Sequence, residues 1–226
     1  MLFGRRLGRP LSSAKKDLLN EGDTKYLIQT SSDGDSKLNP STFFHFTPKS
    51  LNVEIGFGAG EHLSHQCALN PNEGFIGCEP FINGACAFYQ KALNSNLNNV
   101  RIYRDDALQL LSVFTPKSLD KIYVLFPDPW PKKKHHKRRL LQESTLNLFH
   151  DLLKDTGQLL IATDHVDYAE WITKKIKKTP YFIWQNQEDP EKLFPNWTET
   201  RYQRKALIQN RKAVFFHLIK NQLFKE

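Results

Sequence analysis

One segment of the sequence combines a carboxylate, an aromatic ring and a dense run of cations. Asp128 lies between two prolines, Trp130 follows it, and residues 132–139 include six Lys or Arg and two His. Proline lacks a backbone donor and restricts the residue before it, so residues 126–139 are predicted to form a stiff loop rather than a helix or a central strand. An acid with cations directly outside it favours chemistry on a polyanion.

Three glycines that follow an apolar run form the second candidate site. Gly56, Gly58 and Gly60 lie between Glu54 and Glu61. Glycine lets the backbone turn tightly and approach a ligand, and a following helix offers free N–H groups. The spacing is GxGxG rather than the GxGxxG of dinucleotide-binding loops, and the flanking carboxylates would repel a pyrophosphate. S-adenosyl-L-methionine, which carries a sulfonium and an ammonium and no phosphate, fits this loop better.

Two further acids follow apolar runs. Glu79 is placed to accept hydrogen bonds from both hydroxyls of a ribose, and Asp106 to accept one from an adenine amino group. An acid at such a position is more often a helix N-cap or a solvated residue, and Asp105 is a candidate for either of these two roles. Four acids are nevertheless expected at the C-terminal ends of strands, where doubly wound sheets bind ligands: Glu54, Glu79, Asp106 and Asp128.

The elements that must position these residues alternate along the chain. Strands are expected near 51–56, 74–78, 100–104, 120–126, 158–163, 181–186 and 212–219. Helices are expected near 61–69, 81–95, 107–114, 138–154 and 166–178, with none between 187 and 212. This alternation predicts an α/β fold: a doubly wound, Rossmann-like, mostly parallel seven-stranded sheet with an antiparallel last strand.

Composition sets broader limits. The chain has 226 residues, 39% of them hydrophobic, and a net charge of +8, which suits one core and is compatible with nucleic acid, an anionic membrane or no specific partner. Residues 1–50 are predicted to be a basic and polar, partly disordered extension. Its acid-free first 16 residues have three open interpretations: a transit peptide, an RNA-contacting arm or a solvated tail.

Several classes of site are not indicated. The three Cys form neither a disulfide framework nor a zinc motif, which fits a reducing cytoplasm. No apolar run reaches the roughly 18 residues of a membrane span. His62 and His65 lie one helical turn apart but lack a third ligand, so no metal is expected. The sequence does not distinguish a monomer from a homodimer.

Taken together, these motifs resemble the bacterial tRNA (guanine-N7-)-methyltransferase family over roughly residues 51–219. The resemblance implies that residues 51–226 are a catalytic methyltransferase domain and that a guanosine in the tRNA variable loop is methylated with S-adenosyl-L-methionine. The motifs that carry it are Glu54–Gly60, Glu79–Phe81, Asp106–Ala107, Phe126–Arg139, Ala162–Asp164 and Thr200–Gln203.

The resemblance also implies roles for single residues. Cofactor contacts are implied for Glu54, Gly56, Gly58, Gly60, Glu79, Asp106 and Asp128, of which Asp128 is also implied to be catalytic. Substrate contacts are implied for Lys132, Asp164, Thr200, Arg201, Tyr202 and Gln203, and RNA contacts for Lys134, His135, His136, Lys137, Arg138 and Arg139. The family's last motif usually ends in Glu where this chain has Gln203, which keeps an acceptor without the charge; Glu199 is a candidate substitute.

The chemistry leaves two roles open for Asp128. Guanine N7 has a free lone pair, so alignment rather than a base should dominate catalysis. A carboxylate at Asp128 would stabilise the purine as it becomes cationic. Alternatively, Asp128 or Asp164 would accept hydrogen bonds from the guanine N1–H and amino group. Two rival classes, a dinucleotide-dependent oxidoreductase and a non-catalytic RNA-binding module, explain fewer of these residues.

Overall fold

The structure is a computed structural model that describes residues 6–29 and 37–223. It contains two compact units, residues 1–115 and 116–226. The expected disorder within residues 1–50 falls in part on residues 1–5 and 30–36, which lie outside the described residues.

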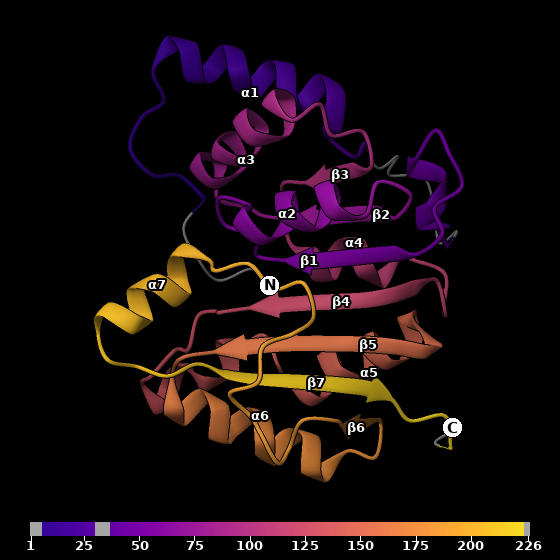
Figure 1. Ribbon diagram of the computed structural model, residues 1–226, viewed down its shortest axis with the longest axis vertical. Helices are drawn as coiled ribbons and strands as arrows, with labels where there is room; N and C mark the ends of the chain where they lie inside the picture. The colour runs from indigo at the N-terminus through magenta and orange to yellow at the C-terminus, as the bar shows by residue number, and fades with distance from the viewer. Residues whose placement is uncertain (1–5, 30–36, 224–226) are drawn as a thin grey trace. The chain divides into compact units, whose positions relative to one another are not determined.

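The described residues of the first unit form three parallel strands and four α-helices (Figure 1). Every residue of the first two strands is buried, as is typical of parallel strands covered on both faces. The strands are β1 (Leu51–Ile55), β2 (Gly74–Cys78) and β3 (Val100–Tyr103). The helices are α1 (Ser13–Tyr26), α2 (Glu61–Leu69), α3 (Ile82–Asn94) and α4 (Ala107–Ser112), with a short 3-10 helix η1 (Pro40–Phe43).

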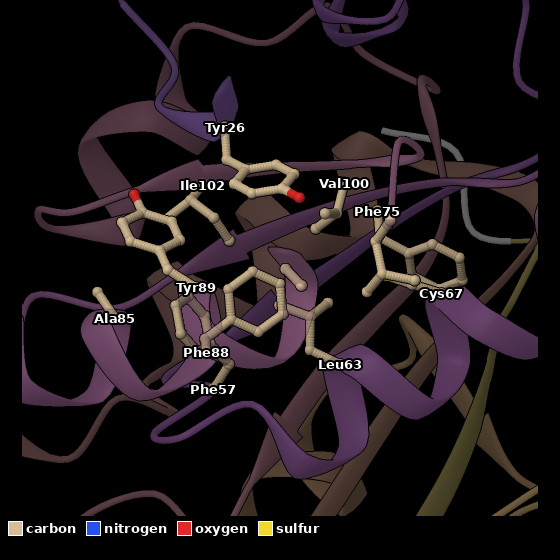
Figure 2. Packing of buried hydrophobic residues seen from close by; sticks show 12 residues of the cluster. Tyr26, Phe57, Leu63, Cys67, Phe75, Ala85, Phe88, Tyr89, Val100 and Ile102 are labelled. Atoms are coloured by element: carbon tan, nitrogen blue, oxygen red, sulfur yellow. The ribbon is translucent and has the colours of Figure 1, made fainter. Parts of the chain in front are cut away.

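The core of this unit joins the N-terminal helix to the strands. Figure 2 shows Tyr26 of α1 beside Tyr89 of α3, and their rings stack with centroids 5.9 Å apart. Phe57 and Phe88 pack in the same cluster, at 5.2 Å between centroids. The side chain of Tyr89 also donates a hydrogen bond to Asp23 at 2.9 Å. Helix α1 is therefore part of the folded unit.

The start of the described chain is bound to the start of α3. The carbonyl of Arg6 accepts from the Ile82 backbone N–H at 3.0 Å. Asn83 accepts from the Gly8 N–H at 3.0 Å and donates to the Arg9 carbonyl at 3.1 Å. These bonds satisfy a donor that the first turn of a helix leaves free.

Within the second unit, the part of the chain that the structure describes forms four strands and three α-helices (Figure 1). Helix α6 buries Tyr168, Ala169, Ile172 and Ile176, the spacing of one helical face. The strands are β4 (Leu119–Leu125), β5 (Leu153–Thr163), β6 (Phe182–Trp184) and β7 (Val214–Lys220). The helices are α5 (Glu143–Leu152), α6 (Val166–Lys178) and α7 (Arg201–Ile208), with a 3-10 helix η2 (Lys133–Arg138).

The strand order is β3-β2-β1-β4-β5-β7-β6. Strand β7 runs antiparallel to both of its neighbours, β5 and β6. The predicted α/β fold with an antiparallel last strand is thus confirmed. In the described ranges, none of the helices has the length and apolar character needed for a membrane span.

The helix expected near 138–154 is shorter in the structure, Glu143–Leu152, because residues 133–138 form a 3-10 helix and β5 already begins at Leu153. Two further helices were not expected. Helix α7 lies in the interval 187–212, where none was expected, because its surface is polar and only Ala206 is buried. The missed signal is Thr200 followed three residues later by Gln203, a capping-box pattern: the Thr200 hydroxyl accepts from the Gln203 N–H at 3.2 Å. Helix α1 was missed because its apolar stripe is thin, with Leu18 and Tyr26 at either end.

Candidate active site

The glycine loop between β1 and α2 is left-handed at all three glycines. Gly56, Gly58 and Gly60 have φ angles of 73°, 60° and 70°. A Cβ on Gly60 would lie 2.3 Å from the ring of Phe88, whereas a Cβ on Gly56 would have nothing within 4 Å. Core packing therefore requires Gly60, while the backbone of Gly56 borders open space of the kind that a bound ligand needs.

Glu79 holds this loop in place. One oxygen of its carboxylate accepts from the Gly58 N–H at 2.7 Å, and the other accepts from the Phe81 N–H at 2.9 Å. On the other side of the loop, a Cβ on Gly84 would lie 2.5 Å from the Gly58 carbonyl oxygen. The Glu79 carboxylate therefore fixes the loop through two backbone groups on either side of β2's end.

Glu54 has a buried histidine partner that the sequence analysis missed. The distance from His62 Nδ1 to Glu54 Oε2 is 2.7 Å, and both side chains are buried. The sequence analysis considered His62 only with His65, as a metal pair. Across the described ranges, no group of three or more His, Cys, Asp or Glu side chains is arranged to hold a metal ion.

Asp106 has a structural role. It is buried, and its carboxylate caps α4 by accepting from the Leu108 N–H at 3.1 Å. Of the two roles left open for Asp105, a cap or a solvated acid, the structure excludes the cap: the Asp105 carboxylate accepts from the Asp106 N–H at 2.8 Å and pairs with Arg6, and its side chain is 38% exposed.

The register of β1, β2 and β3 places Glu54, Glu79 and Asp106 at the same edge of the sheet. Ile55 is paired with Cys78, and Cys78 with Tyr103, so the acids near the ends of β1, β2 and β3 lie at one edge. Burial, and then the charges of Glu79 and Asp106, raise the pKa of the Cys78 thiol. An edge with carboxylates and a glycine backbone that borders open space fits a cationic ligand such as S-adenosyl-L-methionine.

The loop after β4 holds Asp128 between two strained residues. Phe126 and Trp130 have φ angles of 52° and 43°, a left-handed conformation that bulky residues rarely adopt. Such strain persists where surrounding contacts enforce it, often at functional sites. Asp128 is exposed when its whole residue is considered. Its carboxyl group is nevertheless partly surrounded by protein, and this burial raises the pKa of Asp128. As predicted, residues 126–132 form neither a helix nor a strand, but the loop predicted to extend to residue 139 is interrupted by η2 (Lys133–Arg138), because no proline follows Pro131 to prevent a helical turn.

The basic run that follows forms the 3-10 helix η2. Lys132, Lys134 and Lys137 are exposed, while His135, His136 and Arg138 are half-buried. The indole of Trp130 is covered: the Arg138 guanidinium lies 5.1 Å from its centroid and the His135 ring 5.9 Å. These lysines and Lys133, which is also exposed, are therefore available to a polyanion.

Arg139 differs from the rest of the run because its side chain is 0% exposed. Its Nε donates to the Pro129 carbonyl at 2.9 Å, and its Nη2 donates to Asp167. The guanidinium lies 5.0 Å from the ring centroids of both Tyr168 and Trp171. An RNA contact was predicted for Arg139, but its side chain is enclosed by protein.

The predicted substrate residues after β5 are each engaged within the second unit. Asp164 pairs with Arg211 at 2.8 Å. Gln203 accepts from the Trp197 indole at 2.7 Å. Thr200 caps α7, and the exposed Arg201 and Tyr202 lie on its first turn.

Glu199, the candidate substitute for the family's glutamate, is also engaged. Its carboxylate accepts from Arg204 Nε at 2.8 Å. The charge that Gln203 lacks is therefore present nearby, but it is already paired with a cation.

Comparison with known proteins identifies the family of this chain. A family model described as a putative methyltransferase matches residues 48–216. The tRNA (guanine-N(7)-)-methyltransferase of Agrobacterium fabrum is 36% identical over 96% of this chain and 94% of its own. The tRNA (guanine-N(7)-)-methyltransferase of Wolbachia pipientis is 39% identical over 85% of this chain and 82% of its own. Among solved structures, the 16S rRNA methyltransferase KamB shares the fold, with a TM-score of 0.55 at 13% identity over 94% of this chain and 96% of its own.

The fold and the glycine loop define a class I methyltransferase that uses S-adenosyl-L-methionine. Within this class, the chain belongs to the tRNA (guanine-N7-)-methyltransferase family. The class, the family and the cofactor that the sequence motifs predicted are confirmed.

Proposed function

We propose that this protein transfers the methyl group of S-adenosyl-L-methionine to N7 of a guanosine in the variable loop of tRNA. The observation that carries the proposal is the Asp128 loop: a carboxylate in a strained Pro-Asp-Pro turn, followed directly by exposed lysines. The near full-length similarity to relatives named for this activity supports it. The proposal includes the cytoplasmic location that the cysteine content predicted.

The proposed site divides the work among its residues. Glu54, Gly56, Gly58, Gly60, Glu79 and Asp106 bind the cofactor, which supplies an electrophilic methyl group on its sulfonium when bound. Lys132, Asp164 and residues 200–203 bind the target nucleotide. Lys134 and Lys137, with the half-buried His135, His136 and Arg138, bind the RNA backbone, where each neutralised phosphate releases counterions.

Asp128 acts where positive charge develops. Guanine N7 is already a nucleophile, so this chain needs no general base, and its contribution is to align the base and to stabilise the cationic purine. An ionised Asp128 supplies the second effect. The competing role, in which Asp128 or Asp164 accepts from the guanine N1–H and amino group, contributes to alignment instead.

The test of the function is a methyl-transfer assay on an unmodified tRNA transcript, with the product nucleoside identified by mass. We expect the product nucleoside to be 7-methylguanosine, and chemical cleavage of the tRNA at this nucleotide should locate it in the variable loop. A transcript that contains 7-deazaguanosine, which lacks N7, should give no product. Methylation of the 7-deaza transcript, or a thermal shift with NAD but none with S-adenosyl-L-methionine, would overturn the proposal.

A second assay separates the two roles of Asp128. Inosine in place of the target guanosine removes the 2-amino group but keeps N7. If Asp128 stabilises charge, the Asp128→Asn variant loses the same factor in single-turnover rate on both transcripts. If Asp128 holds the amino group, the loss is smaller on the inosine transcript, because that contact is already absent.

A further inference from the structure

We propose that Arg139 is a positioning residue: from inside the protein it holds the Pro129 carbonyl and thereby sets the place of Asp128, and it does not bind RNA. This inference rests on the proposed function of Asp128. It concerns the one cation of the basic run that is fully enclosed.

The first observation is the bond itself. Arg139 Nε donates to the carbonyl of Pro129, the residue directly after Asp128, at 2.9 Å. Pro127 and Pro129 have no N–H, so the turn around Asp128 lacks two of its own backbone donors. The Arg139 side chain supplies a donor to this turn from outside it.

The second observation is what surrounds the guanidinium. The rings of Tyr168 and Trp171, three residues apart on α6, each lie 5.0 Å from it, and Asp167 of the same helix accepts from its Nη2. Its remaining nitrogen, Nη1, finds no hydrogen-bond acceptor in the described part of the chain. The aromatic faces and Asp167 together offset the cation, as such rings do for Arg.

The third observation is that side chains of α6 also form hydrogen bonds with the backbone just after Arg139. The Tyr168 hydroxyl accepts from the Leu141 N–H at 3.3 Å, and the Trp171 indole donates to the Leu141 carbonyl at 3.1 Å. Gln142 donates to the Arg139 carbonyl at 3.1 Å. Both the side chain of Arg139 and the backbone that follows it are thus fixed by hydrogen bonds. The bond from Arg139 to the Pro129 carbonyl connects this fixed segment to the Asp128 turn.

A phosphate contact would require this arrangement to open. The Arg139 side chain would have to leave two rings, a carboxylate and a carbonyl. The exposed Lys137 needs no such change. The two residues, two positions apart, therefore make opposite predictions and serve as a matched pair.

The test compares Arg139→Lys with Lys137→Ala in kinetics and in tRNA binding. Lysine keeps the charge but has a single nitrogen, so it cannot hold Pro129 and Asp167 together. We expect kcat to fall by about 10- to 100-fold in Arg139→Lys, the effect of a small misplacement of a catalytic group. Its KM for tRNA, its affinity for S-adenosyl-L-methionine and its salt dependence of binding should be unchanged.

Lys137→Ala should show the reverse. We expect weaker tRNA binding, a log–log salt slope reduced by about one and a normal kcat at saturation. If Arg139→Lys instead shows the Lys137→Ala behaviour, with normal kcat, the positioning role is wrong and Arg139 binds RNA.

Asp167→Asn provides a second variant in case Arg139→Lys fails to fold. Asp167 is 52% exposed and isosteric with Asn, so the fold should tolerate the change. We expect the same loss in kcat, smaller in size, with unchanged KM; a wild-type kcat in Asp167→Asn would overturn the inference.

A readout without tRNA separates this inference from the proposed function. Carbon-13 NMR titration of the Asp128 carboxyl should show its raised pKa falling toward the ordinary value in Asp167→Asn, because a released turn exposes the carboxyl to water. An unchanged titration would contradict the positioning role. If the wild-type protein fails to methylate tRNA, the function is wrong, but this titration still decides the role of Arg139.

Discussion

The Nδ1 atom of His62 lies 2.7 Å from Oε2 of Glu54, and the two side chains are only 2% and 5% exposed. The contact joins the first turn of α2 to the end of β1, on either side of the glycine loop. A buried acid needs a hydrogen-bond partner, and His62 is one. His62 therefore belongs to the framework of the proposed cofactor site.

Replacing His62 by Ala should destabilise the protein and weaken cofactor binding. Removing one partner of a buried polar pair costs about 1–3 kcal/mol, measured as the free energy of unfolding in urea. Binding of S-adenosyl-L-methionine, measured by calorimetry, should weaken as well. His65→Ala, on the same helix but half-exposed, is the control. An equal loss in both variants would show that the Glu54 contact is not the cause.

Alanine at Gly56 and at Gly60 should have different effects. Both residues are left-handed, so each substitution costs about 1–2 kcal/mol of folding free energy. At Gly60 a Cβ also meets Phe88 at 2.3 Å, so Gly60→Ala should be much less stable by urea unfolding. At Gly56 the methyl projects into open space, so Gly56→Ala should chiefly lose affinity for S-adenosyl-L-methionine. Normal cofactor affinity in Gly56→Ala would exclude this position from the site.

Asp128→Asn should lose activity without losing stability. Burial raises the pKa of Asp128 in the folded state. The protonated form therefore favours folding: this stabilisation is fully present below the pKa of the unfolded state and is lost as the pH rises through the pKa of the folded state. At neutral pH the ionised carboxyl opposes folding. The variant should therefore melt no lower than wild type at pH 7, while its single-turnover methylation is slower by about 100-fold or more.

The wild-type rate provides an independent check on Asp128. Because the proposed role requires the ionised form, the rate should fall as the pH drops through the raised pKa, above the range of an ordinary aspartate. A rate that is independent of pH in this range, with stable protein, would contradict the role.

Gln203→Glu should improve substrate binding. The side chain of Gln203 accepts from Trp197 and lies on the first turn of α7. A carboxylate makes hydrogen bonds about twice as strong as those of an amide, so we expect KM for tRNA to fall about fivefold. Glu199→Gln is the matched control, and it should leave KM unchanged because Glu199 pairs with Arg204. A higher KM in Glu199→Gln would instead assign the substrate charge to Glu199.

The expected elements agree with the structure where the sequence pattern was strong. Helices α2 and α6 begin and end at the expected residues, Glu61–Leu69 and Val166–Lys178. Their boundaries follow a glycine loop in one case and a clear apolar face in the other. Helix α7 was missed because it buries a single residue, so hydrophobic periodicity carried no signal, and only the cap at Thr200 marked it.

The amino-acid sequence by itself determined the class of chemistry, because glycine spacing, strand-end acids and the Asp128 turn depend on local backbone constraints that residue types reveal. Only the tertiary structure decided which charges face inward. Arg139 and Lys137 belong to one basic run, yet aromatic residues of α6 enclose Arg139 and leave Lys137 exposed. Partners some thirty residues away in the chain determine this difference, and no local pattern encodes them.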